Sequence, residues 1–581
     1  MYKRRHELIK SKFNEFFLPT LFTSMANNTC LFADSLIVSF LIGAINLSAI
    51  QVVSPVVNLV NLIYWMIGLG GSVLASVAKA EYDDEKSNFY FTVSMVSLIV
   101  LGIIIMVLGL LFSDTIINIL CSTEQIKPLA KEFFTIMIIG MPFLCYMMSL
   151  SYFIRTDGMP NLPLIAILIS NIANIILDFV YINVFGMGVG GAALATVSGY
   201  ILGSLYITRY FFKSKRTFKL LSRAKIKLNR FFTYLKEICT SGFSSSSTQL
   251  FITLKLFAIN ILISWVLGKS GLIAFSVCNN IAFIIYMFLI GTSQTMSPIV
   301  SVYNQEEDYS GVNYTIKRSL KIALTSSIII AGIFIIFPQI AIMLFSVKNP
   351  ADIPVVFTAV RLYAISFIGL AVTFVMMFYG QAIKKNLFAS TVSCIEGFLV
   401  PVLGAYLLVP LIGFVGIWIA FILAEIIAIL YIFIYSKHVE RKSNGEYSGF
   451  FMIKKVDYDN VLDLTTDANL NDCVDLARNV ESYLKDKKIN DLTAVRVGLA
   501  IEEMLVNIIN TNENLNTIDV LVKIKSDKIL ISLKDQGKEF NPTIERDDSE
   551  FSNINVLKNI SDKIDYARVL GLNSTVITIV K

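Results

Sequence analysis

Polar and ionisable side chains interrupt long apolar stretches in the first half of this 581-residue chain. Asp34 lies in one stretch, and Asp178 lies in another with Asn174 one helical turn before it. Thr196 lies in a third. An ionisable side chain inside a membrane helix costs about 2.5–3.5 kcal/mol, so each one needs a reason. Two carboxylates close together favour uptake of a proton or a cation, and an amide and a hydroxyl can complete the oxygen shell of Na⁺.

A structural role is the alternative for this first set of residues. Asp34 would then cap a kink in its helix, and Asn174 and Asp178 would hydrogen-bond to neighbouring helices.

The second half carries a different set of charges, Lys255, Glu396 and Glu425. Each lies about 12–13 residues from the end of an apolar stretch, close to the midplane of a bilayer at a rise of about 1.5 Å per residue. Unpaired charges at this depth are costly, so we expect Lys255 to neutralise one or both glutamates. Both a static salt bridge and a substrate or ion site remain open.

A third set of polar residues lies near the end of the chain, in AIEEMLVNIIN (500–510) and LKDQGKEFNP. Glu503 and Asn507 are four residues apart and therefore share one face of a helix. Asp535 and Gly537 follow in the second segment. Without further context, Glu503 and Asn507 would be an ordinary solvated helix face.

The elements that must position these residues are mostly membrane helices. The chain is 55% hydrophobic and only 16% charged, where soluble proteins have about 25% charged residues. This composition predicts an all-α polytopic membrane domain of about twelve helices. The expected spans are roughly 16–43, 47–78, 89–112, 133–154, 162–184, 189–212, 239–267, 271–301, 318–345, 359–382, 386–409 and 413–437.

Basic residues predict the orientation of these helices. They gather at the N-terminus, in alternate loops and after the last apolar stretch, whereas loops such as GAINLS carry none. By the positive-inside rule we expect a multi-pass protein of the plasma membrane with both termini cytoplasmic. The same loops account for the net charge of +6, so no nucleic-acid partner is expected.

An internal repeat of roughly 225 residues relates 39–73 to 264–296, which predicts two six-helix lobes around a central cleft. The composition then changes sharply after the last apolar stretch. The expected divisions are a first lobe (1–212), a basic loop (213–238), a second lobe (239–437), a linker (438–449) and a soluble tail domain (450–581).

The tail pattern predicts a small α+β sandwich. FFMIKKV reads as a strand, and two helices follow, in ANLNDCVDLARNVESYLKDK and DLTAVRVGLAIEEMLVNIIN. A hairpin is expected in TIDVLVKIKSDKILISLKD, then a helix near 553–564 and a final strand pair in DYARVL and STVITIVK.

The helical region resembles the multidrug and toxic compound extrusion (MATE) transporters. The resemblance rests on Pro19, on LFADSLIVSFLIG and LSAIQVVSP, on the glycines at 68, 70 and 71, and on NIANIILDFVYINVFGMGVGGAALATVSGYILG (171–203). It implies that Asp34, Asn174, Asp178 and Thr196 form the cation-coupling site of the first lobe.

The tail resembles histidine-kinase/Hsp90-type ATPase domains, in particular the anti-sigma-factor serine kinases. The resemblance implies that Asn507 holds Mg²⁺, that Glu503 is the general base and that Asp535 accepts a hydrogen bond from the adenine amino group of ATP or ADP. It also implies that Gly537 belongs to the nucleotide-binding site. Two features depart from that pattern. Glu539 replaces a glycine, and FSNI (551–554) replaces the glycine-rich phosphate lid. These departures leave nucleotide binding and enzyme activity open.

Together these resemblances imply a cation-coupled (H⁺ or Na⁺) antiporter that exports small organic or drug-like compounds by alternating access across the lipid bilayer. Its tail would bind nucleotide or a soluble regulatory protein. Two alternatives stay open, a flippase for lipid-linked oligosaccharide and a membrane sensor whose effector is a serine kinase. The scarcity of deep basic residues argues against the flippase, because its cargo carries pyrophosphate.

Overall fold

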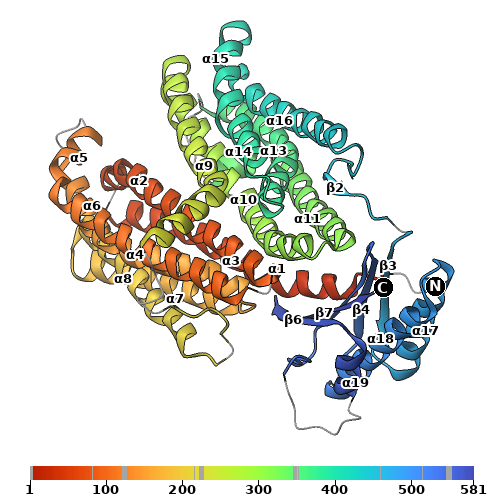
Figure 1. The fold of residues 1–581 in the computed structure, drawn as a ribbon. Coiled ribbons are helices and arrows are strands. Elements are labelled where there is room, and N and C mark those ends of the chain that lie inside the picture. Colours follow the sequence, from red (N-terminus) through yellow and green to blue (C-terminus); the bar gives the residue numbers. More distant parts are fainter. Residues whose placement is uncertain are drawn as a thin grey trace.

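The structure is a computed structural model that describes most of the chain (Figure 1). The described residues are 4–42, 44–81, 83–120, 127–214, 216–221, 228–344, 350, 352–457, 459–512, 515–544 and 553–581. Within these ranges some side chains, including those of 26–49, lie outside the description.

The first lobe is a bundle of long apolar helices. Its elements are α1 (Glu7–Ile42), α2 (Ala44–Tyr64), a π-helical turn (Trp65–Leu69), α3 (Gly70–Ala80), α4 (Asp84–Leu111), α5 (Ser113–Leu120), α6 (Lys127–Thr156), α7 (Asn161–Asp178), a second π-helical turn (Phe179–Val184), α8 (Gly188–Ile207) and a 3₁₀ turn (Thr208–Phe212). Helix α8 packs against α6 and α7, and α1 packs along α7.

The second lobe repeats this arrangement. Its elements are α9 (Leu228–Val266), α10 (Gly268–Gln305), α11 (Tyr309–Ile336), α12 (Gln339–Leu344), α13 (Ile353–Ala382), α14 (Asn386–Cys394), a π-helical turn (Ile395–Leu399), α15 (Val400–Ile412) and α16 (Val415–Lys442). Asp83 caps α4, and Asp308 caps α11 at the matching place of the repeat by accepting a hydrogen bond from the Gly311 N–H at 2.9 Å.

Ten helical stretches of the described residues are long and apolar enough to cross a membrane. The expected spans at 16–43 and 239–267 fall on α1 and α9, which contain side chains outside the description. Helix α9 begins at Leu228, so part of the expected loop 213–238 is helical.

The two lobes meet at the ends of their helices that adjoin the tail domain, an end of the molecule called the tail side below (Figure 1). Arg155 of α6 donates to the side-chain oxygen of Gln294 of α10 at 2.7 Å. Gln305 at the end of α10 donates to Glu81, which follows α3, at 3.0 Å. Both contacts join one lobe to the other.

The tail domain is a five-stranded antiparallel sheet with helices on one face. Its elements are β3 (Val461–Asp467), α17 (Leu470–Asp486), α18 (Asp491–Thr511), β4 (Thr517–Ile524), β5 (Lys528–Asp535), α19 (Asn553–Ile560), β6 (Lys563–Val569) and β7 (Leu572–Val580). The strand order is β3-β4-β5-β7-β6. The helices and one face of the sheet share a hydrophobic core separate from that of the lobes.

Alternation along the strands gives the sheet two different faces. On β4, Val520 and Val522 belong to the core under the helices, whereas Asp519 and Lys523 point to the opposite face. That opposite face lies against the N-terminal segment and the α10–α11 turn. We call it the docking face.

The segment that joins the lobes to the tail differs from its predicted form. In FFMIKKV only β2 (Ile453–Lys454) is a strand, paired with β1 (Tyr447–Ser448). Met452 is buried in the hydrophobic core of the lobes, with Phe450 and Phe451 packed against it. The first strand of the sheet is instead β3, which the sequence pattern did not single out.

Candidate functional site

The structure brings together three of the four residues expected to couple ions in the first lobe. Asn174 and Asp178 lie on α7, are buried, and follow one another by one helical turn. The side-chain amide of Asn174 donates to the hydroxyl of Thr196 on α8 at 3.2 Å. Asp34 lies in α1, which packs along α7, but its side chain is outside the description.

The hydroxyl of Thr196 also donates to the backbone oxygen of Ala192 at 3.1 Å. The threonine is therefore held in one rotamer and presents its oxygen to α7. An amide, a hydroxyl and a fully buried carboxylate together supply the oxygen ligands that a proton or a hard cation uses.

The charged residues of the second lobe form an ion pair and a second glutamate that interacts with both members of the pair. Lys255 on α9 lies 3.7 Å from the carboxylate of Glu396, measured from Nζ to Oε1, and both side chains are nearly buried. Glu396 lies on the π-helical turn that interrupts the helix from α14 to α15. The ion pair therefore joins α9 to that turn.

Glu425 has a partner that the sequence did not indicate. The hydroxyl of Thr373 on α13 donates to Glu425 Oε2 at 2.8 Å. Glu425 lies on α16 beside Gly369, where a Cβ would approach its side chain to 2.4 Å. A threonine in an apolar helix is common, so only the packing of α13 against α16 identifies this contact.

The tail residues expected to bind nucleotide lie on the helix side of the sheet. Glu503 and Asn507 are on α18, and Asp535 ends β5 in the alternation that faces the helices. Partial burial and the neighbouring Glu502 raise the pKa of the Glu503 carboxyl, a shift that suits a general base.

Asp535 is held by its surroundings. Its Oδ1 accepts hydrogen bonds from the amide of Asn573 at 2.8 Å and from the Gly537 N–H at 2.7 Å. Burial raises the pKa of this carboxyl. Its Oδ2 has no hydrogen-bond partner among the described residues, and this is the atom that could accept the amino group of an adenine.

The remaining tail residues fit a nucleotide in part. The amide nitrogen of Asn507 donates to the backbone oxygen of Glu503 at 2.8 Å, which leaves its Oδ1 as the atom that could hold Mg²⁺. A Cβ at Gly537 would approach the side chain of Asn512 to 2.5 Å, so a larger residue would displace that side chain. In the lid segment, Phe551 and Ser552 and the side chain of Asn553 lie outside the described residues.

A buried ionic network on the docking face was not expected from the sequence. The guanidinium of Arg4 lies 2.7 Å from Asp308, 3.2 Å from Asp463 and 3.3 Å from Asp519. Its side chain is only 3% exposed. It therefore joins the start of the chain, the α10–α11 turn and two strands of the tail.

Lys534 extends this network from β5. It is paired with Glu306 and lies 3.7 Å from Asp308. Lys523 donates to the backbone oxygen of Glu306 at 2.7 Å. Burial alone would raise the pKa of the Asp308 carboxyl, but Arg4 and Lys534 together hold it well below its ordinary value. The docked arrangement therefore favours the ionised aspartate.

The tail also touches the first lobe. Val569 and Leu570, at the β6–β7 turn, are buried in the core of the helical domain. A Cβ at Gly158, in the turn between α6 and α7, would lie 3.3 Å from the backbone nitrogen of Gly571. The tail domain thus contacts both lobes on the tail side.

Comparisons with known proteins agree with this architecture. The chain is 29% identical over 202 residues to the "Multidrug export protein MepA" of Staphylococcus haemolyticus and 31% identical over 177 residues to that of Staphylococcus aureus strain MRSA252. These alignments span 35% and 30% of this chain, and 45% and 39% of those relatives, less than half of their length.

Solved structures share the fold of the helical domain. A structure described as the "Outward-facing conformation of a multidrug resistance MATE family transporter of the MOP superfamily" has a TM-score of 0.69 at 19% identity, covering 74% of this chain and 96% of its own. A MOP superfamily transporter from Pyrococcus furiosus also has a TM-score of 0.69, at 20% identity, covering 76% and 97%.

The family model MatE matches residues 19–180 and 245–407. The first segment falls within the first lobe, and the second falls within the second lobe. The two matched segments make up more than half of the chain, and the protein therefore belongs to the MatE family.

Proposed function

We propose that the protein exports small organic compounds by alternating access of its two lobes, driven by inward flow of H⁺ or Na⁺ across the plasma membrane. The observation that carries this proposal is the buried cluster of Asn174, Asp178 and Thr196 between α7 and α8. A buried carboxylate with neighbouring oxygen ligands is expensive inside a membrane unless it binds a cation or a proton. The names of the MepA relatives, which are multidrug export proteins, support the cargo class.

Binding of the ion can drive transport if its affinity differs between the two states of the lobes. The cluster lies within one lobe, whereas the contacts that change during alternating access lie between lobes. Protonation or Na⁺ binding at Asp178 changes the packing of α7 against α1 and α8, and α1 also packs on α10 of the second lobe. Helix α1 therefore connects the ion site to the second lobe, so that ion binding can shift the equilibrium between the two states of the lobes.

The test is uptake of a fluorescent organic cation into proteoliposomes with an imposed pH or Na⁺ gradient. Asp178→Asn should abolish gradient-driven transport, whereas the control Asp114→Asn, at an exposed carboxylate paired with Lys131, should keep it. The gradient that drives uptake identifies the ion. Gradient-driven transport that survives Asp178→Asn would exclude this residue as the coupling site.

We further propose that the tail is a cytoplasmic regulatory domain that binds a nucleotide or a soluble protein on its helix side. Two observations support this role. The docking face is occupied by the lobes, and on the other face Asp535 Oδ2 has no hydrogen-bond partner in the part of the chain that the structure describes. A ligand on the helix side can therefore alter docking without competing for the docking face.

Binding of ATP and ADP to the full-length protein, with and without Mg²⁺, tests the nucleotide form of this proposal. Asn507→Ala should remove the magnesium-dependent part of the binding. The matched control Asn460→Ala changes an exposed asparagine whose side-chain amide donates to Asp457 at 2.8 Å in a surface turn, and this variant should bind normally. Absence of nucleotide binding by the folded protein would leave protein docking as the role of this face.

A further inference from the structure

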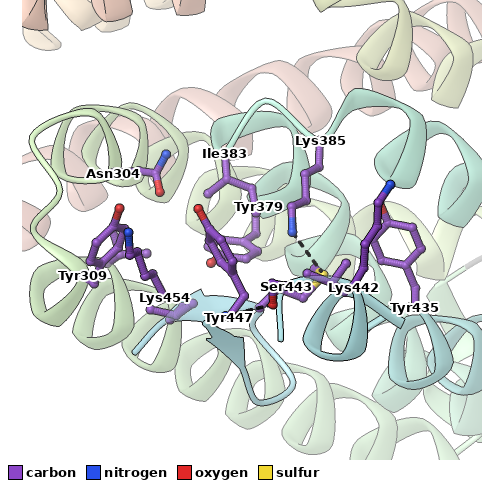
Figure 2. Close-up of a pocket in the computed structure, with 14 residues that line it drawn as sticks. Asn304, Tyr309, Tyr379, Ile383, Lys385, Tyr435, Lys442, Ser443, Tyr447 and Lys454 are labelled. Carbon is purple, nitrogen blue, oxygen red and sulfur yellow. Dashed lines mark hydrogen bonds between the residues drawn. The ribbon is translucent and has the colours of Figure 1, made fainter. Parts of the chain in front are cut away.

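A cavity of about 420 Å³ lies on the tail side of the second lobe (Figure 2). One side is formed by the ends of α10, α11, α13 and α16, and the other by the linker that carries β1 and β2. The cavity is within the size range of small-molecule sites, which is about 300–1,000 Å³.

The lining of this cavity is positively charged. Lys385, Lys442 and Lys454 line it, and the described lining residues include no acidic side chain. Lys454 is paired with Glu446 at 2.6 Å. Lys385 and Lys442 have no carboxylate partner among the described residues, so two cations face the cavity without a counter-ion from the described chain.

Lys385 is placed by the turn between α13 and α14. The preceding Lys384 adopts a left-handed backbone conformation with φ of 61°, which turns the chain back towards the linker. Figure 2 shows the Lys385 side chain directed to Met452, whose sulfur lies 3.7 Å from Nζ. Its Nζ also lies 5.5 Å from the ring centre of Tyr447. Burial among these groups lowers the pKa of the Lys385 ammonium, a cost that a bound anion would relieve.

The linker side of the cavity is formed by residues that are packed against the second lobe. The hydroxyl of Tyr379 donates to the backbone oxygen of Phe451 at 2.8 Å, and Met452 is buried in the core of the lobes. Tyr447 pairs with Lys454 across the β1–β2 ladder. The wall that faces Lys385 and Lys442 is therefore fixed against the second lobe.

Tyrosine hydroxyls supply further hydrogen-bond donors to this cavity. Tyr309 and Tyr447 line the cavity, and their hydroxyls have no hydrogen-bond partner among the described residues. A phosphate group has several strong acceptor oxygens, so it can take hydrogen bonds from ammonium and phenol donors at once. A halide or a carboxylate would use fewer of these donors.

We propose that this cavity binds a phosphate-bearing anion, held by Lys385 and Lys442 between the helix ends of the second lobe and the linker. The helix ends lie at the level where a bilayer presents its headgroups, so the ligand is an anionic phospholipid headgroup or a free phosphate compound. Bound there, it holds the linker, and with it the tail domain, against the second lobe. This site does not depend on the transport proposal or on the nucleotide proposal.

The test uses the full-length protein in nanodiscs of phosphatidylcholine, with or without phosphatidylglycerol, and with titrated inorganic phosphate in a further arm. Hydrogen exchange of the linker amides at 446–455 is the readout. Protection that rises with phosphatidylglycerol alone assigns a lipid headgroup, and protection that rises with inorganic phosphate assigns a soluble ligand. Each result supports the site.

Variants make the assignment specific to the cavity. Lys385→Gln and Lys442→Gln should each weaken the apparent affinity by about tenfold, because each removes one charge-assisted hydrogen bond. Lys385→Arg should keep binding and shows that the position tolerates change. Lys437→Gln is the control, because Lys437 lies on α16 outside the cavity and pairs with Glu440 at 2.9 Å. The proposal would be overturned if neither phosphatidylglycerol nor inorganic phosphate changed the hydrogen exchange of the linker. It would also be overturned if the glutamine variants and the control bound the anion with equal affinity.

Discussion

The two buried glutamates of the second lobe are held by different partners. Lys255 is paired with Glu396, whereas Glu425 takes its hydrogen bond from Thr373. The expected group of one lysine and two glutamates includes one direct ion pair, Lys255 with Glu396, whereas Glu425 interacts with both side chains electrostatically and is divided from the pair by its own hydrogen bond to Thr373. The division matters because the pair and the single carboxyl respond differently to substitution.

Lys255→Gln should destabilise the protein by about 3–5 kcal/mol, since it leaves Glu396 buried without its counter-charge. The double variant with Glu396→Gln should lose less than the sum of the two single variants. Thermal unfolding in detergent measures all three. Additive losses would show that the two side chains do not interact, and full stability with lost transport would assign Lys255 to a ligand site instead.

We expect Asp463 to make docking of the tail depend on pH. Burial, followed by the neighbouring Asp308, raises the pKa of its carboxyl to about 6 even though Arg4 lowers it. Between pH 3.8, the ordinary pKa of an aspartate, and about pH 6, Asp463 is therefore protonated in the docked state and ionised in the released state. Docking should strengthen as the pH falls through this window. Below pH 3.8, Asp308 becomes protonated in the released state while it stays ionised in the docked state. Docking therefore weakens again as the pH falls further.

A spin-label pair on exposed residues of α17 and α9 measures the docked fraction as the pH changes. Asp463→Asn should remove the strengthening between pH 7 and about 4 and should keep the tail docked at pH 7, because Arg4 retains Asp308 and Asp519. An unchanged pH profile in this variant would assign the effect to another group.

At the scale of helices, close backbone approach depends on small residues. A Cβ at Gly242 of α9 would lie 1.8 Å from the backbone oxygen of Met66, and one at Gly70 would lie 2.7 Å from the backbone of Gly242. These glycines allow α9, which starts the second lobe, to cross the π-helical turn of the first lobe. The crossing gives a physical reason for part of the glycine pattern at 68–71.

Gly242→Ala should lower the thermal unfolding midpoint, since the added methyl forces the two backbones apart at a cost of about 1–3 kcal/mol or more. Gly332→Ala on α11 is the matched control, because a Cβ there meets no atom within 4 Å. Equal midpoints for the two variants would mean that the crossing relaxes without cost.

At the scale of the whole molecule, the tail domain contacts both lobes at the ends where they already meet. Arg4, Lys534 and the β6–β7 turn connect it to the α10–α11 turn and to the turn at Gly158. A domain attached to both lobes on one side opposes their separation on that side. Docking should therefore favour the state that is closed on the tail side.

Arg4→Gln should release the tail and open the tail side more often, whereas Arg5→Gln, which alters only an exposed pair with Asp467, should not. The measurement is alkylation of Ser297→Cys, at a buried position between the lobes, in a background with the native cysteines replaced. We expect labelling at least about tenfold faster in Arg4→Gln. Loss of a buried charge partner costs about 3–5 kcal/mol, and a shift of only about 1.4 kcal/mol in the equilibrium between the states of the lobes is tenfold. Equal labelling rates in the two variants would show that docking of the tail does not affect how often the lobes open on the tail side.

Elements that depend on local pattern could be predicted from the amino-acid sequence alone. Apolar runs of the length of a bilayer, the repeat of roughly 225 residues and the alternation in the tail predicted the helices, the two lobes and most of the α+β domain. One-turn spacing placed Asn174 beside Asp178, and also Glu503 beside Asn507. In the first lobe, Thr196 joined that group through the resemblance, and the structure places it within hydrogen-bond distance of Asn174.

Contacts between residues far apart in the sequence could not be predicted and came from the packing of the folded chain. The network of Arg4, Asp308 and Asp519, the Thr373 bond to Glu425 and the cavity around Lys385 each join segments that are separated by dozens to hundreds of residues. No periodicity links such positions, because the contact depends on how whole helices and the sheet pack against each other. The burial of Met452 in the lobes, within a segment expected to be a strand, has the same cause.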